Sequence, residues 1–500
     1  MALRPGLEGR LTSQSSARGG AWTALAPMLA SIGARAIDLA FALVYLRLLK
    51  PEGVGAYQFL VVLTTYLDTL VNFGLNTLLA REAARAPEKT RGLVVAVLRL
   101  RVLLWLLAAV PLAVVLGPLR AAAGLPPDAP LAGWLFWLAL APSIVASTAT
   151  GVLWSRERLD VAAGVAVATT AVKVALGSLL LLGGLGLVGL ALTSLLAGTV
   201  GALLLVVTAW RVVPVPGPSS SAMGRALSMW GAARESWPLF VNQLLAGLFF
   251  KIDSLLLPGL AGAAQAGAYA AAYKVIEGTL VIPSSFTLAI FPRLSQRAES
   301  GAGHLAEAYR LGLRLLLQVA LPLATLLALL ASPIVELLGD RQFLPDGAIA
   351  LAALVWFMPI SFANGLTQYV LIALGRQRSL TPVFLGALVF NLGANWLLIP
   401  RLGYVGAALT TVASEAVLAV PFGVLLAHHL PGVSPLREGA RPAIAVLLMA
   451  PVVWWLRDAL GPLPAAAAGA AVYAVALWAF GGIDLEERGL LRRLVARQGA

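Results

Sequence analysis

The sequence predicts an all-α polytopic membrane protein with about 14 transmembrane helices, in which two six-helix lobes related by a parallel repeat precede two C-terminal helices. The chain is 60% hydrophobic and 12% charged, with a mean hydropathy of +0.88, so a soluble fold could not bury its apolar surface. Apolar runs of roughly 20 residues, the length that crosses a bilayer, recur along the whole chain. Segments of the first half also return in the second half.

The elements follow in order along the chain. Residues 1–20 are polar, and the apolar run after them is too long for a signal-peptide core, so we expect a cytoplasmic N-terminal tail and an uncleaved first span. The N-lobe, 21–209, holds spans 1–6 at 21–47, 55–79, 93–116, 131–153, 161–182 and 187–209. The Pro- and Ser-rich segment 210–236 is predicted to be a cytoplasmic inter-lobe linker, with an amphipathic helix in its second half, 222–236.

The C-lobe, 237–430, is predicted to hold spans 7–12 at 237–257, 268–291, 312–332, 348–374, 380–399 and 404–427. The segment 431–483 adds spans 13 and 14, at 441–458 and 463–480. Residues 484–500 are rich in Arg and Glu and are expected to form a cytoplasmic C-terminal tail.

Three pairs of similar segments lie at nearly the same separation and indicate the repeat: Gly186–Thr193 with Gly403–Thr410, Gly55–Tyr57 with Gly267–Tyr269, and Arg156-x-Arg158 with Arg376-x-Arg378. Six spans per copy is an even number, so both copies enter the membrane from the same side. Paired units of this kind are typical of alternating-access transporters, which bind their substrate between the halves.

Most of the 36 Lys and Arg residues lie in segments on one side of this topology. The positive-inside rule therefore places both termini in the cytoplasm, and the net charge of +13 reflects membrane topology rather than a nucleic-acid partner. With no Cys and three His, metal sites and disulfides are not expected. No loop is long enough for a catalytic domain, so the sequence does not predict an enzyme.

Charged residues at membrane depth are costly and usually face a cavity or the interior of a bundle. The candidate cavity cations that bind substrate are Arg35, Lys173, Lys251 and Lys274. The candidate coupling or structural acids are Asp38, Asp68, Asp253, Glu277 and Glu415.

Lys173 is the first choice as a ligand-facing cation, because no acid lies within a turn of it on its own helix. Arg35/Asp38 and Lys274/Glu277 are i, i+3 pairs that could also neutralise themselves. Lys251, Asp253, Lys274 and Glu277 are expected at one depth of spans 7 and 8, as a coupling network or a structural one. Arg99 and Arg101 are weaker candidates, because long side chains near a helix end can reach the surface.

Asp68, Asn72 and Asn76 form a polar stripe along span 2, at i, i+4 and i+8. Such a stripe lines either a cavity or a helix–helix contact. Both alternatives stay open from the sequence.

Four segments resemble a known family: Asp68–Arg85 (DTLVNFGLNTLLAREAAR), Ser236–Pro292 (beginning SWPLFVNQLL), Ile372–Arg378 (IALGRQR) and Ile399–Glu415 (IPRLGYVGAALTTVASE). They resemble the polysaccharide-transporter, or Wzx-type, branch of the multidrug/oligosaccharidyl-lipid/polysaccharide (MOP) exporter superfamily. The resemblance covers spans 1–12. It implies two lobes in a V shape, a cationic central cavity, and flipping of lipid-linked oligosaccharides to the outer leaflet.

The resemblance also assigns the family's acid on the seventh span to Asp253 and its Arg after the second span to Arg81. The two extra spans resemble those of the lipid II flippase branch, where they form a groove for a lipid tail.

The resulting prediction is a flippase for polyprenyl-pyrophosphate-linked oligosaccharide in the bacterial cytoplasmic membrane, with no cofactor and with H⁺ or Na⁺ as candidate coupling ions. Its expected partners are the lipid-linked glycan, membrane lipids, and the glycan polymerase and glycosyltransferases of the same process. The alternatives are a drug/cation antiporter of the related MATE branch and a lipid II flippase. Embedded cations offset the embedded acids here, which counts against a cation antiporter.

Overall fold

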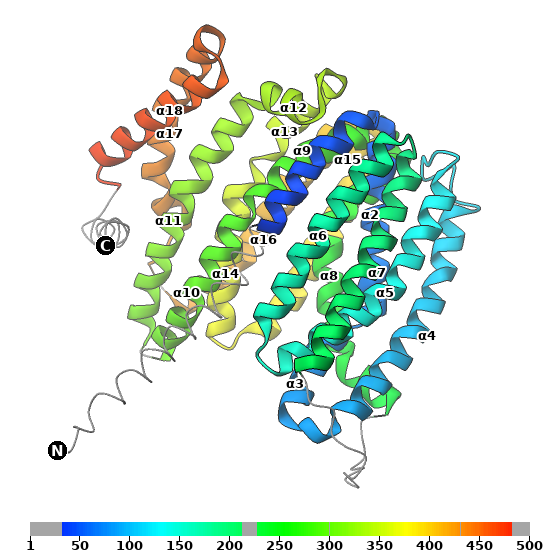
Figure 1. Cartoon of the computed structure of the whole chain (residues 1–500). Coiled ribbons are helices and arrows are strands. Elements are labelled where there is room, and N and C mark those ends of the chain that lie inside the picture. The colour runs from blue at the N-terminus through cyan, green and yellow to red at the C-terminus, as the bar shows by residue number, and fades with distance from the viewer. Residues whose placement is uncertain (1–32, 213–227, 300, 431, 483–500) are drawn as a thin grey trace, which may run out of the picture. The chain divides into compact units, whose positions relative to one another are not determined.

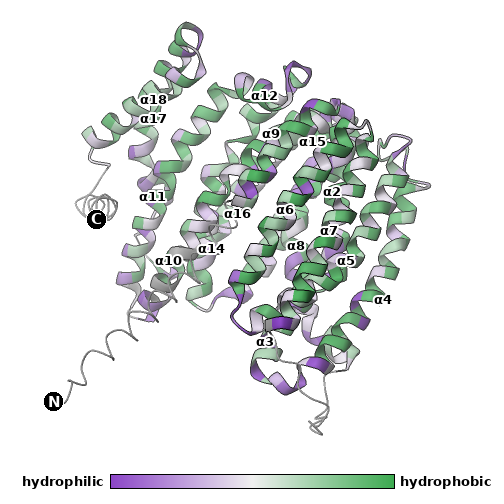
Figure 2. Cartoon of the chain, in the orientation of Figure 1, coloured by the Kyte–Doolittle hydropathy of each residue, from purple (hydrophilic) through white to green (hydrophobic). Residues whose placement is uncertain are grey.

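The computed structural model describes residues 33–212, 228–299, 301–430 and 432–482 (Figure 1), and its described residues contain helices and no strand. Twelve helical segments of this part of the chain are long and apolar enough to cross a membrane. Figure 2 shows hydrophobic residues along helices such as α4, α5 and α6, and hydrophilic residues gathered towards the loops. The predicted all-α polytopic fold is confirmed.

The chain divides into two compact units, 1–267 and 268–500. The first contains a helix over 33–48 and then α2 (Pro51–Asn72), α3 (Leu75–Arg85), α4 (Thr90–Leu116), α5 (Ala129–Ser155), α6 (Leu159–Leu182), α7 (Gly186–Val212) and α8 (Met229–Ala261). The boundary falls within α9 (Ala263–Thr279). In the first unit, α5 packs along α7, and α8 packs against α2.

The second unit continues with α10 (Val281–Glu299), α11 (Ala302–Leu329), α12 (Ala331–Gly339), α13 (Asp346–Leu354), α14 (Phe357–Ala373), α15 (Leu380–Leu402), α16 (Tyr404–His429), α17 (Pro435–Leu460) and α18 (Pro462–Ala479). The helix α16 packs against both α14 and α15, and α11 contacts both α14 and α17.

Several predicted spans are interrupted helices. Span 2 is α2 and α3, separated by Phe73 and Gly74, whose φ angles are 50° and 72°. Span 8 is α9 and α10, separated at Leu280, and span 10 is α13 and α14. Glycine adopts a positive φ without strain, which accounts for the break at Gly74.

Several sequence predictions concern segments that lie wholly or partly outside the described residues. The two tails and most of the linker lie outside them, as does the first part of span 1. The amphipathic helix expected at 222–236 is not a separate element from Met229 onward, because those residues are the first turns of α8. The lobes drawn from the sequence repeat stay a prediction, and α8, the predicted span 7, belongs to the first compact unit.

The repeated Gly-x-x-Gly segments have the same physical role in the two units. Gly186 is the first residue of α7 and Gly403 directly precedes α16, with φ angles of 47° and 57°, a conformation that favours glycine. A Cβ on Gly189 would lie 3.3 Å from Cβ of Leu180 on α6, and one on Gly406 would lie 2.5 Å from the Leu398 carbonyl oxygen on α15. Each segment therefore closes a tight helical hairpin.

The two extra helices are held on α11 by polar contacts as well as apolar ones. The guanidinium of Arg314 lies 2.9 Å from the carboxylate of Glu438 on α17. One turn further along α11, Gln318 Nε2 donates to the carbonyl of Gly482 at 2.8 Å. The backbone carbonyl of Gln318 accepts a hydrogen bond from the hydroxyl of Tyr473. An apolar cluster around Met449 and Val453 completes the contact.

Candidate functional site

Lys173 on α6 forms an ion pair with Asp38 on the helix 33–48. Its Nζ lies 3.4 Å from Asp38 Oδ1, and the two side chains are 34% and 35% exposed. The ammonium also lies 6.0 Å from the ring centroid of Phe41, one turn after Asp38. Lys173 has no acid within a turn on its own helix, and its partner in the structure, Asp38, comes from another helix.

Arg35 lies one turn before Asp38 on the same helix, and its side chain is exposed. It forms no ion pair with any residue of the described ranges, so the intrahelical Arg35–Asp38 pair that the sequence offers as an alternative is absent from them. Arg35, Asp38 and Lys173 therefore bring two cations and one acid to one side of the first unit. We refer to these three residues as the cationic cluster.

Arg101 on α4 is the largest correction to the sequence prediction. The sequence makes it a weaker cavity candidate because a long side chain near a helix end can reach the surface, but this side chain is 0% exposed. Arg99, two residues earlier, is exposed as expected. Burying a guanidinium among apolar helices is unfavourable unless polar groups surround it.

Those polar groups come from two neighbouring spans, the interrupted span α2–α3 and the helix α5. Nη2 of Arg101 donates to Oδ1 of Asn72 at 2.8 Å and of Asn76 at 2.7 Å, both on α2–α3. Nη1 donates to Ser147 at 2.9 Å and to Thr148 at 2.5 Å on α5. One cation thus joins three helical segments, and the polar stripe of span 2 makes helix–helix hydrogen bonds while staying half-buried.

Asp68 belongs to the same group of residues. Its Oδ1 accepts a hydrogen bond from Ser143 on α5 at 3.1 Å, and it interacts electrostatically with Arg101. The sequence held a signal for this cluster, namely a cation within an apolar run and an Asn pair one turn apart on another span. That signal does not say which helices are neighbours.

The residues predicted on spans 7 and 8 fall in different compact units. Asp253 on α8 is 3% exposed and accepts hydrogen bonds from the backbone N–H of Ser254 at 2.7 Å and from its hydroxyl at 3.3 Å. Lys251 is half-buried. Lys274 and Glu277 on α9 form the i, i+3 ion pair that the sequence offered as an alternative, at 3.4 Å. The larger network of the four residues stays a prediction.

Arg81, which the family resemblance singled out, lies on α3 and is partly exposed. It pairs with Glu82 at 2.9 Å and with Glu235 on α8. The Arg after the second span thus ties α3 to α8 within the first unit.

Glu415 on α16 is the central acid of the second unit and is 2% exposed. The side-chain amide of Asn364 on α14 donates to its carboxylate at 2.7 Å and to its backbone carbonyl at 2.9 Å. Among the described residues no Lys or Arg forms an ion pair with Glu415. A buried carboxylate held only by neutral donors is costly to keep charged, which makes it a candidate for exchanging an ion.

A second polar group lies between α15 and α16 in the same unit. Asn391 donates to Ser414 at 2.9 Å, and Asn395 donates to Asn391 at 2.9 Å. Oδ1 of Asn395 and the hydroxyl of Thr410 are buried and make no hydrogen bond with the residues described. Sequence reasoning missed this group, because single Asn and Thr residues in an apolar helix carry little signal.

The family model described as polysaccharide biosynthesis protein matches residues 18–297, more than half of the chain. The chain belongs to this polysaccharide biosynthesis protein family. A second family model, MatE, matches residues 238–397 of this family member. No curated protein sequence matches the chain.

Solved structures share the fold of this family member. The lipid II flippase MurJ, in an inward closed conformation, has a TM-score of 0.71 at 13% identity and covers 90% of this chain and 98% of its own. An inward-facing MATE multidrug resistance transporter of the MOP superfamily has a TM-score of 0.61 at 16% identity, covering 78% and 92%. A MOP superfamily transporter from Pyrococcus furiosus, described as having a binding pocket of reverse polarity, has a TM-score of 0.56 at 16% identity, covering 81% and 94%. The fold is that of the membrane transporters and flippases named above.

Proposed function

We propose that the protein flips a polyprenyl-pyrophosphate-linked oligosaccharide from the cytoplasmic to the outer leaflet of a bacterial cytoplasmic membrane, by alternating access. The observation that carries this proposal is the cationic cluster of Arg35, Asp38 and Lys173. Two cations and one acid leave an excess of positive charge between the helix 33–48 and α6, of which α6 is long and apolar enough to cross a membrane. A pyrophosphate supplies the opposite charge through charge-assisted hydrogen bonds.

The chemistry of such a substrate explains why a protein is required. The glycan and pyrophosphate are polar and cannot cross hydrocarbon alone, whereas the prenyl tail is apolar and remains in the bilayer. In the proposed cycle Lys173 and Arg35 hold the pyrophosphate, and exposure of the site alternates between the two sides. Glycosyltransferases that build the glycan and a polymerase that consumes it are the partners this role calls for.

Three observations favour related alternatives. The MatE match over 238–397 and the buried Glu415, held by neutral donors, fit a cation-coupled antiporter. The likeness to MurJ fits a lipid II flippase, whose substrate is the one its name states. We propose that Glu415 belongs to ion coupling, by H⁺ or Na⁺, in either case.

A reconstitution assay tests the proposal. Purified protein is placed in vesicles that carry a fluorescent polyprenyl-pyrophosphate saccharide, and a membrane-impermeant quencher reports how much reaches the opposite leaflet. We expect protein-dependent flipping that fails when the pyrophosphate is replaced by a neutral linkage. If the same vesicles export cationic dyes and flip neither the polyprenyl-pyrophosphate saccharide nor lipid II, the antiporter is favoured. Flipping of lipid II in preference to other saccharides would favour the second alternative.

A further inference from the structure

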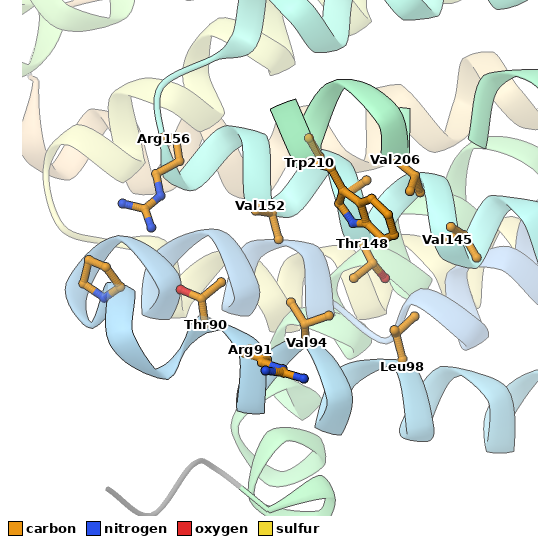
Figure 3. Close-up of a pocket in the computed structure, with 13 residues that line it drawn as sticks. Thr90, Arg91, Val94, Leu98, Val145, Thr148, Val152, Arg156, Val206 and Trp210 are labelled. Carbon is orange, nitrogen blue, oxygen red and sulfur yellow. The ribbon is translucent and has the colours of Figure 1, made fainter. Parts of the chain in front are cut away.

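A lateral cavity of about 440 Å³ lies in the first unit, away from the cationic cluster. Its walls come from α4, α5 and α7, including Val94 and Leu98 on α4, Val145 on α5 and Val206 on α7. Figure 3 shows Arg156 near one end and Leu98 and Val145 near the other. Val145 is 40% exposed, so the cavity opens to the side of the helices rather than into a closed core. We call this cavity the α4–α5–α7 groove.

The groove changes from polar to apolar along its length. Its polar end holds Thr90 and Arg91 at the start of α4, and Arg156 directly after α5. Trp210, also in the lining, stands near the end of α7 and is 76% exposed. These residues lie on the cytoplasmic side in the orientation expected from the charge distribution. Trp is typical of the membrane interface, so Trp210 is expected at the depth of the lipid headgroups. The groove therefore leads from the headgroup level into the hydrocarbon.

The two arginines at the polar end have no acidic partner among the residues described. The lining of the groove contains no Asp or Glu. Of the acids nearby in the sequence, Glu82 pairs with Arg81 and Arg85 and Asp160 pairs with Arg158, whereas Glu88 and Glu157 do not line the groove. Arg91 and Arg156 are both exposed and form no ion pair with any described residue. An apolar slot whose charged lining residues are two arginines and no acid is complementary to an anion attached to a hydrocarbon chain.

We propose that the α4–α5–α7 groove binds one acyl chain of an anionic glycerophospholipid from the cytoplasmic leaflet, with the phosphate held by Arg91 and Arg156. The volume is of the class that holds one small ligand, roughly 300–1,000 Å³. The lateral opening lets the second chain remain in the bilayer. Bulk lipid supplies this ligand at high concentration, and the anionic headgroup distinguishes it from zwitterionic lipid.

The groove also touches the interior of the unit through one residue. Thr148 lines the groove, and its hydroxyl lies 2.5 Å from Nη1 of Arg101. A chain in the groove packs against the helix face that holds this hydrogen bond. Bound lipid therefore stabilises the arrangement in which Arg101 joins α4 and α5, and this site acts on the fold without contacting the transported substrate.

Binding is measured on the purified full chain in mild detergent, by native mass spectrometry and by thermal unfolding, with phosphatidylglycerol and phosphatidylcholine of equal chain length. We expect phosphatidylglycerol to bind and to raise the unfolding temperature, and phosphatidylcholine to do neither. The double variant Arg91→Gln/Arg156→Gln should bind phosphatidylglycerol roughly tenfold or more weakly, because each basic residue near the headgroup adds attraction for anionic lipid.

A matched control removes the same charge from the same two loops. Arg85→Gln/Arg158→Gln neutralises two arginines that do not line the groove, and it should bind phosphatidylglycerol as the unmodified protein does. Val145→Trp fills the apolar end from an exposed position and should abolish binding while the unfolding temperature without lipid is kept. Three outcomes would overturn the proposal. The control variant could lose as much phosphatidylglycerol binding as Arg91→Gln/Arg156→Gln, the two lipids could bind equally, or Val145→Trp could bind phosphatidylglycerol fully. Inorganic phosphate that competes fully with the lipid, with no effect of chain length, would show an anion site only and overturn it as well.

Discussion

Gly55 and Gly267 lie directly against each other where the start of α2 meets the start of α9. A Cβ on Gly55 would lie 3.0 Å from the Gly267 nitrogen and 2.0 Å from the Ala263 carbonyl oxygen. A Cβ on Gly267 would lie 1.9 Å from the Pro51 carbonyl oxygen. These are the first residues of the repeated Gly-Ala-Tyr segments, so both copies of the motif supply the small residue that one close contact requires.

Adding a methyl group at either glycine should therefore lower stability. For Gly55→Ala and Gly267→Ala we expect a loss of about 1–3 kcal/mol, because backbone atoms must move apart. Thermal unfolding in detergent and the yield of monodisperse protein measure it. Gly393→Ala on α15 is the control, since no atom lies within 4 Å of its added Cβ. Equal behaviour of all three variants would contradict the close contact.

The buried Arg101 should be essential for folding. Arg101→Gln leaves acceptors on Asn72, Asn76 and Thr148 without their donor, and we expect a loss of about 2–5 kcal/mol. Arg99→Gln, on the exposed face of the same helix, should leave the unfolding temperature nearly unchanged. If the two variants unfold alike, Arg101 does not hold the three segments together.

The cationic cluster should decide the charge of the substrate. Lys173→Ala and Arg35→Ala should express normally and lose flipping, whereas Lys173→Arg and Arg35→Lys should keep part of it, because a pyrophosphate accepts more than one cation geometry. The vesicle assay described above measures both effects.

The ion pair with Asp38 gives the discriminating variant. If Lys173 serves only to neutralise Asp38, the double variant Lys173→Ala/Asp38→Ala should regain the flipping that Lys173→Ala loses. If Lys173 binds the pyrophosphate, the double variant should stay inactive. A rescue by the double variant argues against anion binding.

Glu415→Gln separates a coupling role from a structural one. Glutamine keeps an oxygen that accepts from Asn364, so the variant should fold, and transport should no longer respond to an imposed H⁺ or Na⁺ gradient. Glu415→Ala should in addition lower stability, because a buried amide N–H loses its carboxylate acceptor. Glu336→Gln, at a partly exposed acid of the same unit, is the control. Transport that follows the gradient normally in Glu415→Gln would remove this residue from coupling.

The orientation of the chain can be measured directly, because it has no native Cys. Asp128 precedes α5 and Gln377 follows α14, and both are exposed. We expect an impermeant thiol reagent to label Asp128→Cys in intact cells and Gln377→Cys only after the membrane is opened. The reverse pattern would invert the topology and place the polar end of the α4–α5–α7 groove on the outer side.

The sequence by itself determined the helical membrane fold, the approximate spans and the family. These follow from properties that each segment carries locally: its apolar length, the placement of Lys and Arg outside the spans, and the repeated glycine motifs. Gly186 and Gly403 show the strength of this kind of signal, since a turn with positive φ at the start of a helix is a local requirement.

The tertiary structure alone decided which charged and polar groups meet. Lys173 has no acid on its own helix, and only packing brings Asp38 to it from the first span. From its place in the sequence Arg101 could reach the surface, but in the structure α2, α3 and α5 surround it with hydrogen-bond acceptors. The reason is physical: the hydrophobic pattern sets how long a helix is and that it lies in the membrane, but in lipid it does not set which helix faces which. That choice depends on close packing and on satisfying buried polar groups, which involve residues far apart in the chain.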